Sequence, residues 1–324
     1  MGRAHEHSLN GSSWPGRTVP DVDTLARLVA GESRRATVSP EDPARAGAED
    51  LELLQRVHAL GPLGPFATVR NRAAVGRLVR EGLLTLDGLL ASAGEEFMRP
   101  ISTAHEVLAV RGRCGGRRTL LQGWISGSDV AVVSGPAGPD LMAAVDRQDG
   151  REYAVMSLDR GSLASLVCQW AGVRTFPAAL PRDLLLPEEL FTQRVADGCA
   201  PVPGPEQLEP VPGEASVDHD AVTGWWGAPW FTWEVTSARH GVNLGLISAQ
   251  PAGNYVFGGD PAASERAGMS MVRVAPVSAQ SVWEALWLLT HGGGAAGAAG
   301  RPVLGGTPRR GPLGEAPVLP RSVD

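Results

Sequence analysis

Residues that could act as nucleophiles are few in this sequence, and none has a recognisable setting. A serine or cysteine nucleophile needs a positioned base and an orienting acid. The sequence has no Gly-x-Ser-x-Gly elbow, because Ser134 lies in a strand-to-turn passage that lacks the first glycine. Cys114 falls in a predicted hairpin turn. We therefore interpret both residues as structural.

Paired carboxylates could serve general acid/base catalysis if the fold brought two of them together. Glu234 with Glu106 or Asp129 are the candidates, but no spacing in the sequence pairs them. A carboxylate-dependent enzyme of unknown substrate therefore remains an alternative. A deep pocket with two convergent carboxylates of displaced pKa would support it.

The metal and phosphate motifs are weak. Asp218-His219-Asp220 places two hard ligands beside an imidazole, but neighbouring residues on an extended loop point to different sides and no second histidine lies at helical ligand spacing. The glycine-rich run 292–300 follows a predicted helix, so it lacks the strand-to-helix turn that directs backbone amides at a phosphate. We expect neither a metal nor a cofactor, and no catalytic residue.

The composition excludes further classes of function. The chain of 324 residues contains no lysine, which rules out a P-loop lysine and a lysine Schiff base. Its net charge of −6 argues against a nucleic-acid partner. The three cysteines are far apart and odd in number, and no apolar run is long enough for a membrane helix. We expect a cytoplasmic protein with no membrane or nucleic-acid partner.

Aromatic residues provide the most specific signal for binding. Six of the nine tryptophans lie between residues 225 and 287. The densest group, which we take as the candidate partner-binding residues, consists of Trp225, Trp226, Trp230, Phe231 and Trp233. Such a group can be part of a sheet core or a partly exposed binding surface, since tryptophan brings a large contact area at low entropy cost. Full burial of the indoles would contradict the second interpretation.

The elements that would position these residues follow a pattern. The first half begins with helices predicted over 51–60 and 73–93, the latter broken at Gly82, and Pro100 is expected to end the helical region. Alternation then predicts strands over 106–113, 119–126, 129–134 and 153–158, followed by a helix that carries Leu163, Leu166, Val167 and Trp170.

The same order recurs near the C-terminus. Strands are predicted over 231–236, 243–249, 254–257 and 271–274, followed by a helix over 282–289. Residues 155–170 align with residues 272–287, strand with strand and helix with helix. The sequence therefore predicts an α+β fold of two duplicated ββββα halves, related by a pseudo-two-fold axis, with a mostly antiparallel sheet flanked by helices.

Composition divides the chain into five regions. Residues 1–48 are predicted to be a disordered leader, and 49–173 hold the N-terminal helices and the first half. Residues 174–222 are rich in proline, and nine carboxylates stand against one arginine between Asp183 and Asp220, which indicates an acidic connector with a short helix near 187–195. The second half covers 223–291, and 292–324 are predicted to be a disordered tail.

Several short stretches resemble the EspG family of cytosolic proteins associated with ESX (type VII) secretion in actinobacteria. They are Leu51-Glu-Leu-Leu with its Gly/Pro turn, Glu81-Gly-Leu83 running into Leu89-Leu90, Arg99-Pro100 before strand 107–113, Gly253-Asn-Tyr-Val-Phe257, and Met271-Val-Arg-Val-Ala-Pro276 with the helix after it. The acidic connector and both tails depart from the family pattern.

The resemblance implies a chaperone or adaptor that binds a helical PE/PPE-like secretion substrate, keeps it soluble and presents it to the secretion machinery. Its partner would be a protein client. A self-associating structural or regulatory module that pairs through a strand edge is the second alternative, beside the carboxylate-dependent enzyme.

Overall fold

The structure is a computed structural model that describes residues 43–143, 152–180, 182–198, 200–204, 207–210, 218–237, 239 and 241–291. Residues 1–42 of the expected leader and the expected tail 292–324 lie outside the described residues.

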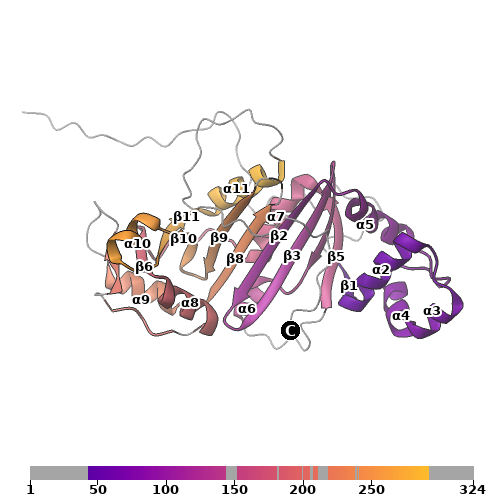
Figure 1. Cartoon of the computed structure of the whole chain (residues 1–324), viewed down its shortest axis with the longest axis horizontal. Helices are drawn as coiled ribbons and strands as arrows, with labels where there is room; N and C mark the ends of the chain where they lie inside the picture. Colours follow the sequence, from indigo (N-terminus) through magenta and orange to yellow (C-terminus); the bar gives the residue numbers. More distant parts are fainter. Residues whose placement is uncertain are drawn as a thin grey trace, which may run out of the picture.

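One antiparallel sheet of eleven strands forms the centre of the molecule (Figure 1). In sheet order the strands are β1 (Ala44–Gly47), β5 (Glu152–Asp159), β4 (Asp129–Ser134), β3 (Arg117–Ser126), β2 (Glu106–Cys114), β8 (Trp230–Ser237), β9 (Val242–Ala249), β10 (Gly253–Gly259), β11 (Met271–Val277), β6 (Leu184–Pro187) and β7 (Glu209–Pro210). Each of these neighbouring pairs is antiparallel.

The two halves meet where β2 pairs with β8, from Leu108 opposite Ser237 to Arg113 opposite Thr232. Outward from this ladder, the first half contributes β2, β3, β4, β5 and β1, and the second contributes β8, β9, β10, β11 and β6. The duplicated α+β fold expected from the sequence is confirmed. It also extends further than expected, because β1 and β6 are equivalent outer strands and each leads directly into a helix.

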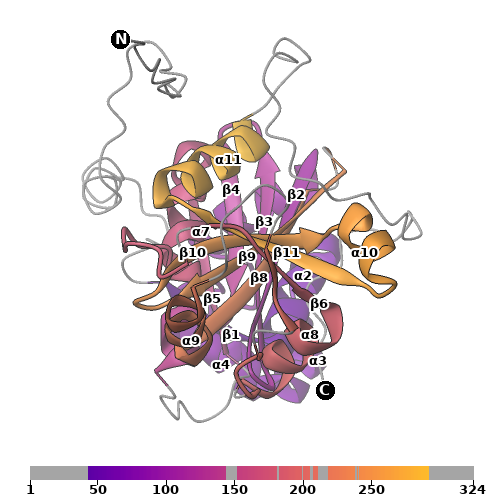
Figure 2. The same ribbon diagram turned by 90° about the vertical axis from the view of Figure 1, so that its left-hand side faces the viewer.

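The described helices are α2 (Ala48–Leu60), α3 (Pro65–Arg70), α4 (Arg72–Arg80), α5 (Ser92–Thr103), α6 (Gly138–Met142), α7 (Leu163–Ala171), α8 (Glu188–Asp197), α9 (His219–Gly227), α10 (Pro261–Ala267) and α11 (Ala279–His291). Figure 2 shows α7 and α11 side by side, and they pack on each other over the sheet. Their apolar sides share one core with strands of both halves, which includes Val110, Val167, Val235 and Leu286.

The opposite face of the sheet is covered separately in each half. Neighbouring residues of a strand point to opposite faces, so Ile125 joins the core under α7 while Trp124 packs with Phe97 of α5 in a second core. In the second half Leu246 lies in the shared core, and Ile247 lies in a third core with residues of α8 and α9. Helices α2 to α5 thus form one end of the molecule, and α8 to α10 the other (Figure 1).

The predicted strands of both meanders and the helices that close them are present with small shifts at their ends. Strands β1 and β6 lie where the sequence predicts no strand. Strand β1 lies inside the stretch expected to be a leader, and β6 and α8 lie inside the expected connector, where α8 matches its predicted helix. These outer strands are four residues long and are held by pairing with β5 and β11 rather than by a local pattern.

Pro100 was expected to end the helical region, and this expectation is wrong because Pro100 lies buried inside α5. A proline in a helix loses one backbone hydrogen bond. Here the loss falls near the end of the helix, three residues before Thr103, and the ring is part of the interior.

Candidate functional site

The five aromatic residues expected to bind a partner are all in the interior. Trp225, Trp226, Trp230, Phe231 and Trp233 are each at most 4% exposed. The expectation of a partly exposed aromatic surface is therefore wrong, and the structure places these side chains in two different cores.

Strand alternation explains this division. Phe231 and Trp233 point into the core shared with α7, where Phe231 meets the edge of Trp170 at a centroid distance of 5.4 Å. Trp230 points to the other face and lies 4.3 Å from the ring of Trp225. The indole N–H of Trp230 donates to the carbonyl of Trp225 at 3.0 Å, so its polar atom is satisfied in the interior.

The carboxylates considered for acid/base chemistry do not meet. Glu234 lies opposite Arg111 in the β2–β8 ladder, five residues along β2 from Glu106, or about 17 Å. The two carboxylates also lie on opposite faces of the sheet. Glu106 is two residues from Leu108 and so shares the face of the core under α7, whereas Glu234 is exposed on the other face. Asp129 pairs with Arg99 at 3.1 Å.

Glu106 has instead a structural environment. Its side chain is fully buried and pairs with Arg160 at 3.2 Å and Arg239 at 3.4 Å, and it accepts a hydrogen bond from Ser237. Arg160 also donates to the carbonyl of Thr290 near the end of α11. This buried carboxylate connects β2, β8 and α11, and it is surrounded by cations rather than by a second acid.

The acidic triplet has a local role. The carboxylate of Asp218 accepts hydrogen bonds from the backbone N–H groups of Asp220 and Ala221, and so caps α9. Across the described residues, no group of three or more His, Cys, Asp or Glu side chains could hold a metal ion.

The outer edge of β1 is blocked against strand addition. The N–H of Arg45 donates to the Glu81 carboxylate at 2.9 Å, and that of Gly47 donates to Asp50 at 2.8 Å. The outer edge of a sheet presents unpaired N–H and C=O groups, to which a strand of another chain can hydrogen-bond. The carboxylates therefore occupy two donors that a second copy of the chain would need.

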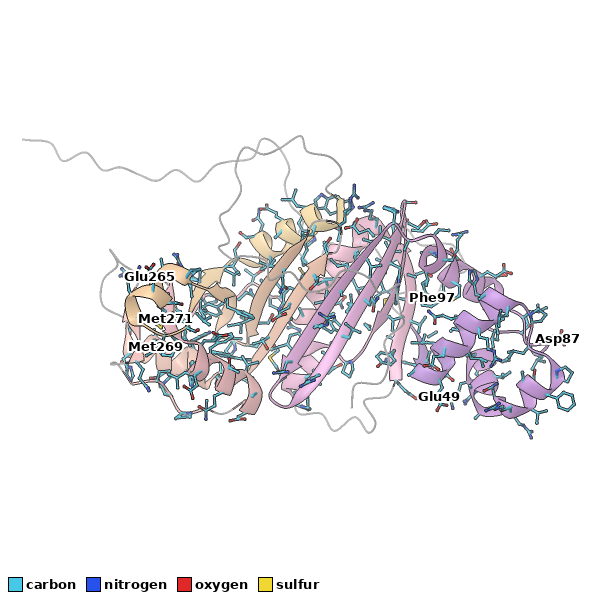
Figure 3. All side chains as sticks on the ribbon, in the orientation of Figure 1. Glu49, Asp87, Phe97, Glu265, Met269 and Met271 are labelled. Atoms are coloured by element: carbon cyan, nitrogen blue, oxygen red, sulfur yellow. The ribbon has the colours of Figure 1, made fainter. Side chains whose placement is uncertain are left out.

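Exposed apolar side chains gather instead at the end of the molecule formed by α2 to α5. Of the nine large hydrophobic residues exposed in the described part of the chain, five lie between residues 60 and 89. We call these five the apolar tip: Leu60 (77% exposed), Phe66 (92%), Val69 (74%), Leu86 (83%) and Leu89 (46%). In Figure 3 the neighbouring Asp87 marks the outer end of this region.

Two residues of the tip, Leu86 and Leu89, stand on a hydrogen-bonded loop between α4 and α5, residues 81–91, which we call the supported loop. Leu63 N donates to the Gly88 carbonyl at 3.1 Å, which attaches the loop to the turn after α2. Ala91 N donates to the Leu83 carbonyl at 3.1 Å, and Leu83 is fully buried. Gly88 adopts φ +73°, a conformation that favours glycine. Leu86 and Leu89 thus stand on an ordered support.

A shallow hollow of about 630 Å³ lies beside the tip, between the end of α2 and the start of α5. It is open to solvent, and its lining is part apolar and part charged. The lining residues are Val57, His58, Gly61, Pro62, Leu89, Leu90, Ser92, Glu95, Glu96 and Arg99. Leu89 belongs to both the tip and the hollow, so the hollow adjoins the tip at this residue.

The exposed leucines of the supported loop follow a helical pattern in the sequence. Leu86, Leu89 and Leu90 recur at helical spacing, which predicts a second short helix after the break at Gly82. The break is present, but the second helix is not. The helix α4 ends at Arg80, and Gly82 and Gly88 both take positive φ, so the chain forms a loop that turns Leu86 and Leu89 outward.

Comparison with known proteins gives few matches. No protein-family model matches the sequence, and no curated protein matches it. Among solved structures the chain is similar to the chaperone EspG5 of the Mycobacterium tuberculosis type VII secretion system, solved in complex with a PE25–PPE41 dimer. The identity is 13%, the TM-score is 0.40, and the match covers 74% of this chain and 92% of that chain. At this TM-score neither fold nor function is assigned from the likeness.

Within the described residues, no helix combines the length and the apolar character needed to cross a membrane.

Proposed function

We propose that this protein is a non-catalytic chaperone or adaptor that covers an apolar helical segment of a client protein with its apolar tip. The concentration of exposed leucine, valine and phenylalanine at one end of the molecule supports this proposal most directly. Large apolar groups gathered on one surface are typical of protein interaction sites.

The ordered support of the tip also favours binding. Leu86 and Leu89 stand on a loop whose backbone is hydrogen-bonded to α4 and to the turn after α2. A preformed surface loses little conformational entropy when a partner docks. Burial of one large apolar side chain contributes about 1.5–3 kcal/mol before the costs of association, so a few tip residues are enough for a specific complex.

Such a chaperone acts by mass action. A partner that binds only the folded, unassociated client stabilises that form by an amount that grows with the partner's concentration. We propose that the client is a helical secretion substrate of the PE/PPE type, which the sequence resemblance implies, and that the encounter takes place in the cytoplasm. Coverage of the client's apolar segment would suppress its self-association.

The test is a binding titration between the purified protein and a purified PE–PPE heterodimer, monitored by calorimetry, with light scattering of the client as a second readout. The tip variant is Leu86→Glu combined with Leu89→Glu. Met269→Glu is the matched control, because Met269 is 54% exposed and lies at the other end of the molecule (Figure 3).

We expect binding and suppression of client scattering by the wild type and by Met269→Glu, and a loss of affinity of at least 100-fold in the tip variant, since two buried apolar contacts are replaced by charges. Equal binding by both variants would refute the tip as the site. Concentration-dependent dimers of the wild type that disappear in the tip variant, without client binding, would favour the self-associating alternative.

A further inference from the structure

We infer that the hollow beside the tip selects client helices that carry an arginine or lysine next to their apolar stripe. This inference rests on the proposed function and specifies the chemistry of the client segment. It is drawn from the charges that line the hollow together with its apolar walls.

The walls of the hollow come from two helices and a loop. Val57 lies in the last turn of α2 and Pro62 in the turn after it, and Leu89 and Leu90 belong to the supported loop. Helix α5 contributes Glu95, Glu96 and Arg99. We call this hollow, which is open to solvent between α2 and α5, the trough, and apolar side chains from one face of a third helix can enter it.

The charges on the α5 side are not balanced locally. Arg99 donates to the Asp129 carboxylate at 3.1 Å, so its charge already has a partner outside the hollow. Among the described residues, neither Glu95 nor Glu96 forms an ion pair. Arg99 also lines the hollow one turn along α5, but its guanidinium is engaged by Asp129, and two carboxylates against this one cation leave the α5 wall with an excess of negative charge.

These carboxylates are placed to discriminate between clients. An apolar helix that fills the trough excludes water and lowers the local dielectric constant, which strengthens charge interactions at its rim. A cation on the client would pair with Glu95 or Glu96, whereas an acidic residue at the same place would be repelled. The apolar contacts then supply affinity, and the two glutamates supply selectivity.

Glu95 has a second role that a test must separate. It lies in the first turn of α5, where a negative charge favours the helix dipole. A loss of stability after its replacement would reflect that role. A change in preference between two peptides would not, because both peptides meet the same folded protein.

The experiment uses three synthetic helical peptides with the same leucine stripe and with arginine, glutamine or glutamate at one flanking position. Their affinities for the full chain are measured by fluorescence anisotropy at low salt and at 0.5 M salt. The protein variants are Glu95→Gln with Glu96→Gln, Glu95→Arg with Glu96→Arg, and the tip variant. Thermal unfolding verifies that each variant is folded.

We expect the wild type to bind the arginine peptide roughly tenfold more tightly than the glutamate peptide, and high salt to reduce this ratio. The double glutamine variant should lose the preference, and the double arginine variant should reverse it. Equal affinity of the wild type for all three peptides would overturn the inference and leave the tip as a non-selective site. If the preference survives in the double glutamine variant, the selecting charge lies elsewhere and the inference is wrong. If the tip variant binds every peptide like the wild type, the proposed function fails as well.

Discussion

The contact between α5 and the supported loop gives the sharpest test of how the tip is built. Gly94 is a helical residue at the point where α5 passes Leu83. A Cβ atom at position 94 would lie 2.1 Å from the carbonyl oxygen of Leu83 and 3.3 Å from a methyl group of Leu90. The oxygen belongs to backbone that accepts the N–H of Ala91, so it cannot rotate away as a flexible side chain would. Gly94→Ala therefore requires the loop and the helix to separate.

The expected cost follows from two opposing effects. Insertion of a methyl group into a packed contact costs typically 1–3 kcal/mol, and a clash with backbone places this change at the upper end. Alanine in place of glycine inside a helix stabilises the folded state by about 1 kcal/mol, because alanine has the higher helix propensity. We expect a net loss of about 2 kcal/mol in the free energy of unfolding. Gly76→Ala in α4 is the matched control, because nothing lies within 4 Å of its would-be Cβ, and it should gain up to about 1 kcal/mol.

Urea unfolding of both variants, followed by circular dichroism, measures the difference, which we expect to be about 3 kcal/mol between them. A second readout is affinity for the client, which should fall in Gly94→Ala and not in Gly76→Ala because the supported loop carries Leu86 and Leu89. A Gly94→Ala protein as stable as the control would refute the close packing of residues 83–91 against α5, and with it the ordered support of the tip.

Three further outcomes are expected. Burial lowers the pKa of His291 below its usual value of 6.5, so the folded state favours the neutral ring. Stability should therefore be intact above pH 6.5 and decline as the pH falls below it. In urea midpoints measured against pH, His291→Gln should flatten this decline. Trp225→Ala should cost about 3–5 kcal/mol of unfolding free energy because the side chain is fully buried, whereas Leu86→Ala should change it by no more than about 0.5 kcal/mol; an equal effect of the two would contradict their assigned positions. Glu81→Ala should free the N–H of Arg45 at the edge of β1 and raise the dimer fraction in light scattering relative to the wild type, whereas unchanged scattering would show that this edge is protected by other means.

The sequence predicts the repeated part of the fold well because its signals are local. Strand alternation, glycine at the hairpins and the apolar stripes of α7 and α11 each act over a few residues, and the duplication supplies a second reading of the same pattern. Strands β1 and β6 carry no such signal. Ala44–Gly47 has no β-branched residue, and Leu184–Pro187 is a uniform apolar run, so both depend on pairing with distant strands.

The site was predicted less well, because exposure is a tertiary property. Tryptophans beside glycine and proline are compatible with a core and with a surface. Trp230 and Phe231 point to opposite faces of β8, and both are buried because each face is covered by a core. Leu86 and Leu89 show the converse error. Their spacing fits the buried face of a helix, but two glycines with positive φ convert that stretch into a loop and expose them.

The pseudo-symmetry shows why one end of the molecule is suited to binding and the other to stability. Each half covers the same sheet face with helices that follow its outer strand. In the second half that layer has a filled interior, because Trp225, Trp226 and Trp230 pack inside it. The guanidinium of Arg194 also donates hydrogen bonds there, to the carbonyls of Trp226 and Ala228. In the first half the equivalent layer carries the end of α2, α3 and the supported loop, which add exposed apolar surface. Since the shared core under α7 and α11 holds both halves together, a change at the tip leaves that core intact. We therefore expect tip variants to lose client binding at little cost in stability, whereas substitutions in the tryptophan core should do the reverse.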